Sequence, residues 1–375
     1  MADRLEEYTE NEIGKLIDEF SVYYQYAEKV IQKSINDYLR QFIELEQSLR
    51  IDLANNLITI DEYNAILGKQ VFNIKKWTKQ KRKMAELLYE INSACNDMTN
   101  DILERLYMDS YNLTIYNTEM HYHREVGEEL MTPKRLKKEK KENDLVIPKK
   151  RLKKKKDMSW NTKRIQSSVK HSIYLGGNLF AIGKRIVKVA VNRNFKSTSD
   201  AMGYIMRGTS EMAKYNSMVQ LKREGVAVRK QWVATFDQRT RDTHRSLDHQ
   251  IRELEEDFSV NGTKGRKGQK RIITYFIKFP REPKAPPEMI CNCRCSIKYL
   301  LGDYPEQLPM RRENILTDEN GKIVERKYET YYDTDGSKKR RLTQEWRDSK
   351  RRIIPDMTYE EWIEWRREQG YDDIE

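Results

Sequence analysis

The sequence predicts an α+β protein, with a long helical N-terminal region, a small antiparallel or mixed α+β module, and a C-terminal extension of hairpins and one helix. Three observations support this prediction. Apolar residues recur at helical spacing through most of the first 225 residues. The period changes to the alternation of strands after Gly225, and two hairpin signals and a capped helix close the chain.

Size and composition favour several units over one. The chain has 375 residues, whereas single hydrophobic cores stop growing at about 250–300 residues. A hydrophobic content of 38%, a charged content of 35% and a mean hydropathy of −0.90 indicate exposed helices around a thin, divided core. We expect a long-helix region for partner docking (1–130), a basic linker or loop (131–159), a helical subdomain (160–226), an α+β module (227–302) and a C-terminal extension (303–375).

Two features bear on the compartment. No run approaches the roughly 18 apolar residues of a membrane span, and the N-terminal residues MADRLEEYTENE lack the charged-then-apolar pattern of a signal peptide. Three of the four cysteines lie within five residues, unlike the distributed pairs of a secreted disulfide scaffold. We expect a protein of the reducing cytosol that has no membrane partner.

The first 123 residues predict three long helices. Residues 10–50 form one helix or two nearly collinear ones, with only Gly14 as an interruption. Thr59 and Glu62 have the spacing of a capping box and begin the second helix, and the third continues from Met98 to about His123. Each helix has an apolar stripe to bury against another helix or another chain.

The net charge of +12 is concentrated in one segment. Residues 134–156 hold 13 Lys and Arg against three acidic residues, a local balance of +10. Proline and dense like charge predict a mobile loop or linker, which is either solvated and self-repelling or binds phosphates without sequence preference. Its composition also resembles a nuclear import signal. The candidate nucleic-acid-binding residues are Lys134, Arg135, Lys137, Lys138, Lys149, Lys150, Arg151, Lys153, Lys154, Lys155 and Lys156.

Helices return over residues 160–225, in three segments of which the last begins near Ser197, with Asp200 at capping spacing. Strands are then expected at 230–237, 271–279 and 293–301, separated by the Gly- and Lys-rich NGTKGRKGQK.

The C-terminal stretch carries two hairpin signals, Asn320-Gly321 and Asp335-Gly336. A final helix is capped by Thr358, presents Trp362 and Trp365 and ends at Gly370. A short helix cannot bury two tryptophans by itself, so we expect it to dock on another surface.

Residues 232–250 carry the most chemistry. Asp237 and Thr240 follow a strand and can accept from the backbone N–H groups of the next turn. If residues 240–248 are helical, Arg241, His244 and Asp248 form one polar stripe while Leu247 faces the other way. A carboxylate can then orient the imidazole. We expect Arg239 and Arg241 to tie strand to turn through Asp237 and Asp248.

This segment and a second one about forty residues later resemble the paired motifs of the head-morphogenesis family of tailed phages, the Mu F-like minor head or minor capsid proteins. The resemblance is most specific over residues 227–300, extends weakly to MRGTSEMAKYN upstream and to MTYEEW near the C-terminus, and covers the first 150 residues only in helical character. Besides Pro287, the motif residues are Trp232, Asp237, Arg239, Thr240, Arg241, His244, Leu247, Asp248, Asn292, Cys293, Arg294 and Cys295.

The resemblance implies a low-copy structural virion component without catalytic activity, bound at the portal vertex during head assembly and linked to DNA packaging or ejection. Its implied partners are the portal protein, the major capsid or scaffold protein, and genomic DNA through the basic segment. Its implied location is the virion, and the host cytoplasm during assembly. One departure from the family is His249, because many relatives have Gly at this position, directly after Leu-Asp. If the turn needs a positive φ, His suits it less well than Gly does.

The cysteines leave three interpretations open. Some relatives carry Cys or His at the positions of Arg241 and His244, so the resemblance suggests a zinc site. Its candidate ligands here are His244, Cys291, Cys293 and Cys295, with His249 as an alternative to Cys291. In a strand the three cysteines share one face, but Cys-x-Cys is tighter than the usual zinc spacer. Otherwise the thiols pack as small apolar groups, or form a vicinal disulfide, which a reducing compartment disfavours.

Two other functional classes remain as alternatives. A stand-alone nucleic-acid-binding protein would use residues 134–156 as its main element. A zinc-dependent hydrolase or nuclease would use His244 and the cysteines. Against the second alternative, His244 and His249 are not an i, i+4 pair, and the sequence has no P-loop or dinucleotide-binding glycine pattern.

Overall fold

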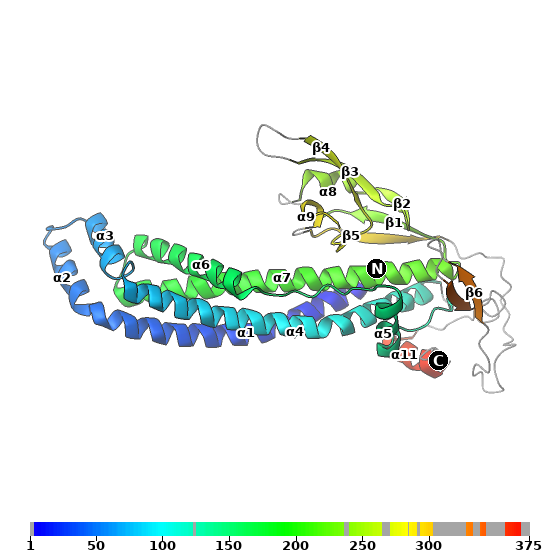
Figure 1. Cartoon of the computed structure of the whole chain (residues 1–375), viewed down its shortest axis with the longest axis horizontal. Coiled ribbons are helices and arrows are strands. Elements are labelled where there is room, and N and C mark those ends of the chain that lie inside the picture. Colours follow the sequence, from blue (N-terminus) through cyan, green and yellow to red (C-terminus); the bar gives the residue numbers. More distant parts are fainter. Residues whose placement is uncertain are drawn as a thin grey trace. The chain divides into compact units, whose positions relative to one another are not determined.

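The computed structural model describes residues 4–122, 125–235, 240–264, 271–283, 285–290, 293–302, 328–332, 338–342 and 357–368. Long helices come first and small antiparallel sheets follow, which confirms the predicted α+β class (Figure 1). The chain divides into two compact units. Unit 1 comprises Met1–Thr9, Leu103–Pro148 and Met206–Glu375, and unit 2 comprises Glu10–Ile102 and Lys149–Ile205. Among the described residues, no helix is long and apolar enough to cross a membrane.

The long helices follow from local signals. Thr59 Oγ1 accepts from the Glu62 N–H at 3.2 Å, and Glu62 Oε2 accepts from the Thr59 N–H at 2.8 Å, so the predicted capping box is present. The helices are α1 (Arg4–Leu39), the 3-10 turn η1 (Arg40–Phe42), α2 (Ile43–Ala54), α3 (Ile60–Gln70), α4 (Lys75–Tyr122), α6 (Lys154–Tyr174) and α7 (Leu179–Arg223).

Three predicted helix boundaries are wrong. The helix that begins at the Thr59 cap ends at Gln70, and a new helix starts at Lys75. No break precedes Met98, because α4 contains neither Pro nor Gly and runs through 48 residues. Ser197 does not cap a new helix, because it lies inside α7, which is 45 residues long. The predicted stop is correct: Gly225 has φ +92°, and the N–H of Val226 donates to the Leu221 carbonyl at 3.0 Å.

In unit 2, α1, α4, α6 and α7 run side by side (Figure 1). Gly183 of α7 allows a close approach to α1, because a Cβ there would lie 2.6 Å from Leu39 Cδ1. A polar centre also links the helices, since Tyr24 OH donates to Asn92 Oδ1 at 2.5 Å. The apolar stripe of α1 is therefore largely covered by other helices of unit 2, the first of the two expected alternatives. Its buried members are Ile13, Leu16, Phe20, Tyr24, Ala27, Ile31, Ile35, Tyr38 and Leu39.

Residues 133–142 form a helix, α5 (Pro133–Glu142), so the predicted loop is wrong over this part. Proline occupies its first turn, where a missing N–H costs nothing, and Thr132 Oγ1 accepts from the Arg135 N–H at 3.2 Å. Leu136 is buried. A cap, one apolar contact and one buried ion pair therefore outweigh the repulsion among the lysines.

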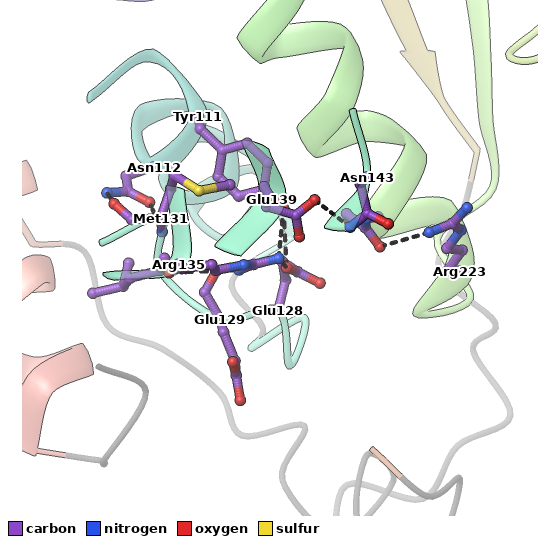
Figure 2. Close-up of polar contacts among 11 residues, drawn as sticks. Tyr111, Asn112, Glu128, Glu129, Met131, Arg135, Glu139, Asn143 and Arg223 are labelled. Atoms are coloured by element: carbon purple, nitrogen blue, oxygen red, sulfur yellow. Dashed lines mark hydrogen bonds and ion pairs between the residues drawn. The ribbon is translucent and has the colours of Figure 1, made fainter. Parts of the chain in front are cut away.

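That ion pair is made by Arg135, whose guanidinium lies among the acidic residues of the preceding segment (Figure 2). Its Nη2 donates to Glu128 Oε1 at 2.5 Å and to Tyr111 OH at 3.2 Å, and its Nη1 donates to the Glu129 carbonyl. Burial opposes the charge, but Tyr111, Glu128 and Glu129 raise the pKa of Arg135 above its ordinary value. Arg135 is thus a structural residue of unit 1.

The α+β module consists of two antiparallel sheets. One has the order β2-β1-β5, and the other pairs β3 with β4. The sequence analysis missed β2, and it missed β3 because Gly262 suggested a turn. A Cβ at Gly262 would lie 2.6 Å from the Tyr275 ring, so this glycine marks close packing inside a strand. The elements are β1 (Val228–Val233), α8 (Asp242–Leu247), β2 (Ile251–Glu253), β3 (Phe258–Lys264), β4 (Arg271–Ile277), α9 (Pro287–Ile290) and β5 (Ser296–Leu301).

At the C-terminal end, β6 (Tyr328–Tyr332) pairs with β7 (Lys338–Leu342), as expected for the second hairpin. Its turn, Asp335-Gly336, and the first hairpin signal, Asn320-Gly321, lie outside the described residues.

The predicted final helix is α11 (Tyr359–Glu368), and Gly370 also lies outside the described residues. Its capping box is present, because the Glu361 N–H donates to Thr358 Oγ1 at 3.3 Å and the Thr358 N–H donates to Glu361 Oε2 at 2.8 Å. Trp362 is fully buried in unit 1, and its indole Nε1 donates to Glu119 Oε2 at 2.5 Å. This tryptophan is therefore covered by its own chain, not by another subunit.

Candidate functional site

The candidate site is the α8–β5 joint, which we define as residues 240–249 and 293–297. The joint packs around Trp232 of β1, which is fully buried. The rings of His244 and Phe258 meet the indole edge-on, with centroids at 5.8 and 5.3 Å. Alternation along β1 directs Trp232 into the core, and α8 packs its inner face over the same ring. The tryptophan thus organises the module from within.

His244 faces the core. Its side chain is 2% exposed, and Leu247 is also fully buried, so the predicted polar stripe with Leu247 on the opposite face is wrong. His244 and Leu247 are three residues apart, so they lie on the same side of the helix, and this side is buried. His244 Nδ1 lies 3.4 Å from Cys295 Sγ and 3.6 Å from Cys293 Sγ. The two motif segments therefore meet in space.

The two thiols have different electrostatic surroundings. A hydrogen bond from Cys293 lowers the pKa of Cys295 below its ordinary value against the opposing effect of burial, and the contact with His244 lowers it further. The same hydrogen bond, together with burial, raises the pKa of Cys293. Cys295 is thus the cysteine of the pair that ionises more readily to the thiolate. A thiolate beside an imidazole is also the donor set that zinc prefers.

The residues present fit three positions of a zinc site. Ligand atoms of His244, Cys293 and Cys295 lie within 4.8 Å of one another. Zinc–ligand bonds of about 2.0–2.3 Å in a tetrahedron place neighbouring donor atoms about 3.5 Å apart, close to the sulfur–nitrogen distances here. Cys291, the predicted fourth ligand, lies outside the described residues. Bound zinc would supply a cross-link between α8 and the segment before β5. The zinc site stays a prediction.

The cysteines reach this position from a non-strand segment. β5 begins at Ser296, so Cys293 and Cys295 precede the strand and the shared strand face that was predicted for them is wrong. Arg281, which the sequence analysis did not select, holds this segment: its Nη1 donates to the Cys295 carbonyl at 2.9 Å. No sequence signal identified Arg281, because its partner lies 14 residues away in the sequence.

The turn around α8 is fixed through the backbone. Asp248 Oδ1 accepts from the Ala234 N–H at 2.7 Å, and the His249 N–H donates to the Trp232 carbonyl at 2.9 Å. His249 has φ +62°, so the turn does require the positive φ that a glycine would adopt more easily. Thr240 Oγ1 donates to the Thr235 carbonyl, and Thr235 Oγ1 donates to the Arg294 carbonyl at 2.9 Å.

Several motif residues have other placements. Arg241 is the N-cap residue of α8 and makes no side-chain cap hydrogen bond, and Arg294 is exposed at its side chain. Asp237, Arg239 and Asn292 lie outside the described residues.

The sequence analysis missed Lys230, which is fully buried on the same face of β1 as Trp232. Its Nζ donates to the Lys278 carbonyl at 3.0 Å, and burial lowers its pKa to about 8. The alternation Val228, Lys230, Trp232 was the available signal.

The predicted nucleic-acid-binding residues fall into two groups. Lys134, Arg135, Lys137 and Lys138 belong to α5 in unit 1, where Arg135 is taken up by its internal ion pair. The remaining members belong to unit 2, in the segment before α6 and in its first turn; they are Lys149, Lys150, Arg151, Lys153, Lys154, Lys155 and Lys156. The two basic blocks are therefore different structural features.

Comparison with known proteins points to the same module. Residues 163–298 match a family model described as Phage Mu protein F like protein, and this stretch includes Trp232, α8 and both described cysteines of the joint. Minor head protein GP7 of Bacillus phage SPP1 is 25% identical over 253 residues, which cover 64% of this chain and 72% of that protein. No solved structure matches the chain. Residues 163–298 are therefore similar to the Mu F-like family, and the chain is similar to a phage minor head protein.

Proposed function

We propose that this chain is a minor head protein that occupies the portal vertex of a tailed-phage virion and acts in head assembly and in DNA packaging or ejection. One observation carries the proposal: the family's paired motifs form a buried joint around Trp232, in a chain related to a protein named as a minor head protein. His244, Cys293 and Cys295 are 2–5% exposed, so they present almost no surface to a substrate. This burial supports an architectural role over the alternative of a zinc-dependent hydrolase.

The portal protein is the proposed partner, and the outer face of α1 is the proposed contact. Val22, Tyr26 and Val30 are 64%, 60% and 38% exposed at i, i+4 and i+8. These three residues, with Tyr23 beside them, make an exposed apolar stripe on a helix whose opposite apolar stripe, which includes Phe20, Ala27 and Ile31, is buried. Helix stripes of this kind dock into grooves of partner proteins.

Co-expression with the portal protein of the same phage, followed by co-purification, tests this contact. We expect the double variant Val22→Asp, Tyr26→Asp to lose the portal protein while it keeps the circular dichroism of the parent chain. The matched control is Ile272→Asp, Phe276→Asp on β4, whose two side chains are 76% and 59% exposed. Equal retention by both double variants, or loss only in the control, would sink the proposed contact.

Location in the virion is a separate test. Immunoblots of purified phage should detect the chain with the portal protein, and blots of infected cells should detect it in the cytoplasm before heads assemble. A chain found only in the cell lysate would contradict the portal-vertex role. The major capsid and scaffold proteins are further proposed partners, and the same co-purification applies to them.

Genomic DNA is the proposed nucleic-acid partner, through the exposed lysines of residues 134–156. Each phosphate contact to duplex DNA contributes about −0.9 to the slope of log affinity against log salt. If the chain acted only as a stand-alone nucleic-acid-binding protein, the variants at Val22 and Tyr26 would leave its function in infection unchanged. A phage that carries this double variant distinguishes the two functions.

A further inference from the structure

A cavity of about 570 Å³ lies in unit 2, beside the first turns of α6. Residues from α4, α6, α7 and the segment before α6 form its walls. Five of the lining residues are cationic, and the one acidic residue is Asp157. The full lining is Asn92, Lys150, Arg151, Leu152, Lys153, Lys156, Asp157, Ser159, Trp160, Lys163, Ser197 and Thr198.

The cavity is built on a firmly held backbone. The N–H of Lys150 donates to Asn100 Oδ1 at 3.0 Å, and its carbonyl accepts from Asn96 Nδ2 and Asn100 Nδ2, both at 2.9 Å. Two asparagines of α4 therefore fix the segment that carries the first three cations. The side chain of Lys150 is partly withdrawn from water, and burial lowers its pKa.

The positive charge of the cavity is available to a ligand. Among the described residues, none of the five lining cations is in an ion pair, whereas Lys154 next to them pairs with Glu86 at 3.6 Å. The carboxylate of Asp157 is already engaged, since it accepts from Asn92 Nδ2 at 3.1 Å and from Asn161 Nδ2 at 3.0 Å. The preferred ligand therefore carries negative charge.

Two more features specify that ligand. No side chain caps the start of α6, and the positive end of a helix dipole favours an anion such as a phosphate. Trp160 adds an aromatic wall, and the guanidinium of Arg164 lies over its ring and supports it. Cavities of about 300–1,000 Å³ hold small ligands, so a cavity of about 570 Å³ is of a size for a single nucleotide.

We propose that this cavity binds an unpaired nucleotide of a DNA strand, with its phosphate among Lys150, Lys153 and Lys156 and its base against Trp160. The inference rests on the proposed contact with DNA and adds the form of DNA that is recognised. The phosphates of a duplex contact the lysines only from outside the cavity, whereas an unpaired base of a single strand also contacts Trp160.

Fluorescence anisotropy of the full chain with a labelled oligothymidylate, and with a blunt duplex of the same length, tests the proposal. We expect the single strand to bind about tenfold more tightly, because stacking of one base on an aromatic side chain has this order of effect. Trp160→Leu should remove this preference and leave duplex binding unchanged. Equal affinity of the parent chain for both probes would overturn the inference.

A charge-matched pair of variants separates the cavity from general electrostatic attraction. Lys150→Gln, Lys153→Gln, Lys156→Gln should weaken single-strand binding about tenfold more than Lys137→Gln, Lys138→Gln, Lys141→Gln, which removes the same charge from α5. Equal weakening by both sets would mean that charge acts without a site. Co-purification of the portal protein with these variants keeps the two proposals apart, because failure at the cavity leaves the portal contact intact.

Discussion

At the scale of single residues, His249 shows how the joint tolerates an unfavourable conformation. Its φ of +62° places a side chain with a Cβ in the left-handed region, and its N–H still reaches the Trp232 carbonyl at 2.9 Å. Its Nε2 also lies 3.1 Å from Asp248 Oδ2. These contacts hold the turn despite the local cost.

Comparing His249→Gly with His249→Ala isolates that cost, because both variants lose the imidazole and only alanine keeps a Cβ. We expect the glycine variant to be more stable than the alanine variant by about 1 kcal/mol. Urea unfolding of the two proteins under identical conditions measures the difference. Equal midpoints would show that the turn relaxes to a negative φ once the imidazole is gone.

At the scale of elements, the contact of α7 with α1 depends on Gly183. Adding a methyl group at this position brings it within 2.6 Å of Leu39 and 2.9 Å of Ile35. We expect Gly183→Ala to destabilise the fold by about 1–3 kcal/mol, even though alanine favours helices. Gly14→Ala is the matched control: nothing lies within 4 Å of its new Cβ, so it should stabilise α1. Thermal unfolding that ranks the two variants in the opposite order would exclude the close helix contact.

The α8–β5 joint makes a second prediction at this scale. Because His244, Cys293 and Cys295 already stand at tetrahedral separations, we expect about one zinc ion per chain when the protein is produced with zinc present. Cys293→Ser, Cys295→Ser should lose the metal, and chelation should lower the unfolding midpoint of the parent chain only. Elemental analysis decides the matter. A chain without zinc, whose double variant unfolds like the parent, would leave the thiols as packing groups.

At the scale of the whole molecule, residues far apart in sequence meet in buried polar contacts. In unit 1, Arg366 of α11 lies 3.3 Å from Glu119 of α4, and both side chains are completely buried. Burial raises the pKa of Glu119 above its ordinary value of 4.5, although Arg366, the Val126 N–H and the Trp362 indole all favour the carboxylate. Folding therefore prefers the protonated acid.

The sign of the pH effect follows. A raised pKa means that the folded chain binds more protons, so the stability from Glu119 is greatest below pH 4.5 and falls as the pH rises through the folded value. The difference in unfolding free energy between the parent and Glu119→Gln should decline with rising pH. Glu62→Gln is the control of opposite sign, because hydrogen bonds from Thr59 lower the pKa of Glu62. Parallel pH profiles for both variants would contradict this assignment.

Much of the fold was predictable because its signals are local. The capping boxes at Thr59 and Thr358 and the stop at Gly225 depend only on neighbouring residues, and each was found in the structure. Boundaries inside α4 and α7 were misplaced, since a change of apolar pattern does not by itself end a helix: α4 has no proline or glycine, and α7 continues through Gly183, Gly203 and Gly208. Strand β3, which contains Gly262, and strand β2, which has only three residues, were missed because their local sequence signal is weak.

By itself, the sequence determined the α+β class, the helix caps and the motif residues that relate the chain to phage minor head proteins, because each resides in a short stretch of chain. Only the tertiary structure decided that His244 turns inward to Cys293 and Cys295, and that Arg135 pairs with Glu128 instead of facing solvent. It alone joined Asn92, Lys150 and Thr198 around one cavity. Burial of a side chain, and with it the charge that the side chain carries, depends on partners up to 247 residues away in the sequence, and no periodicity encodes them.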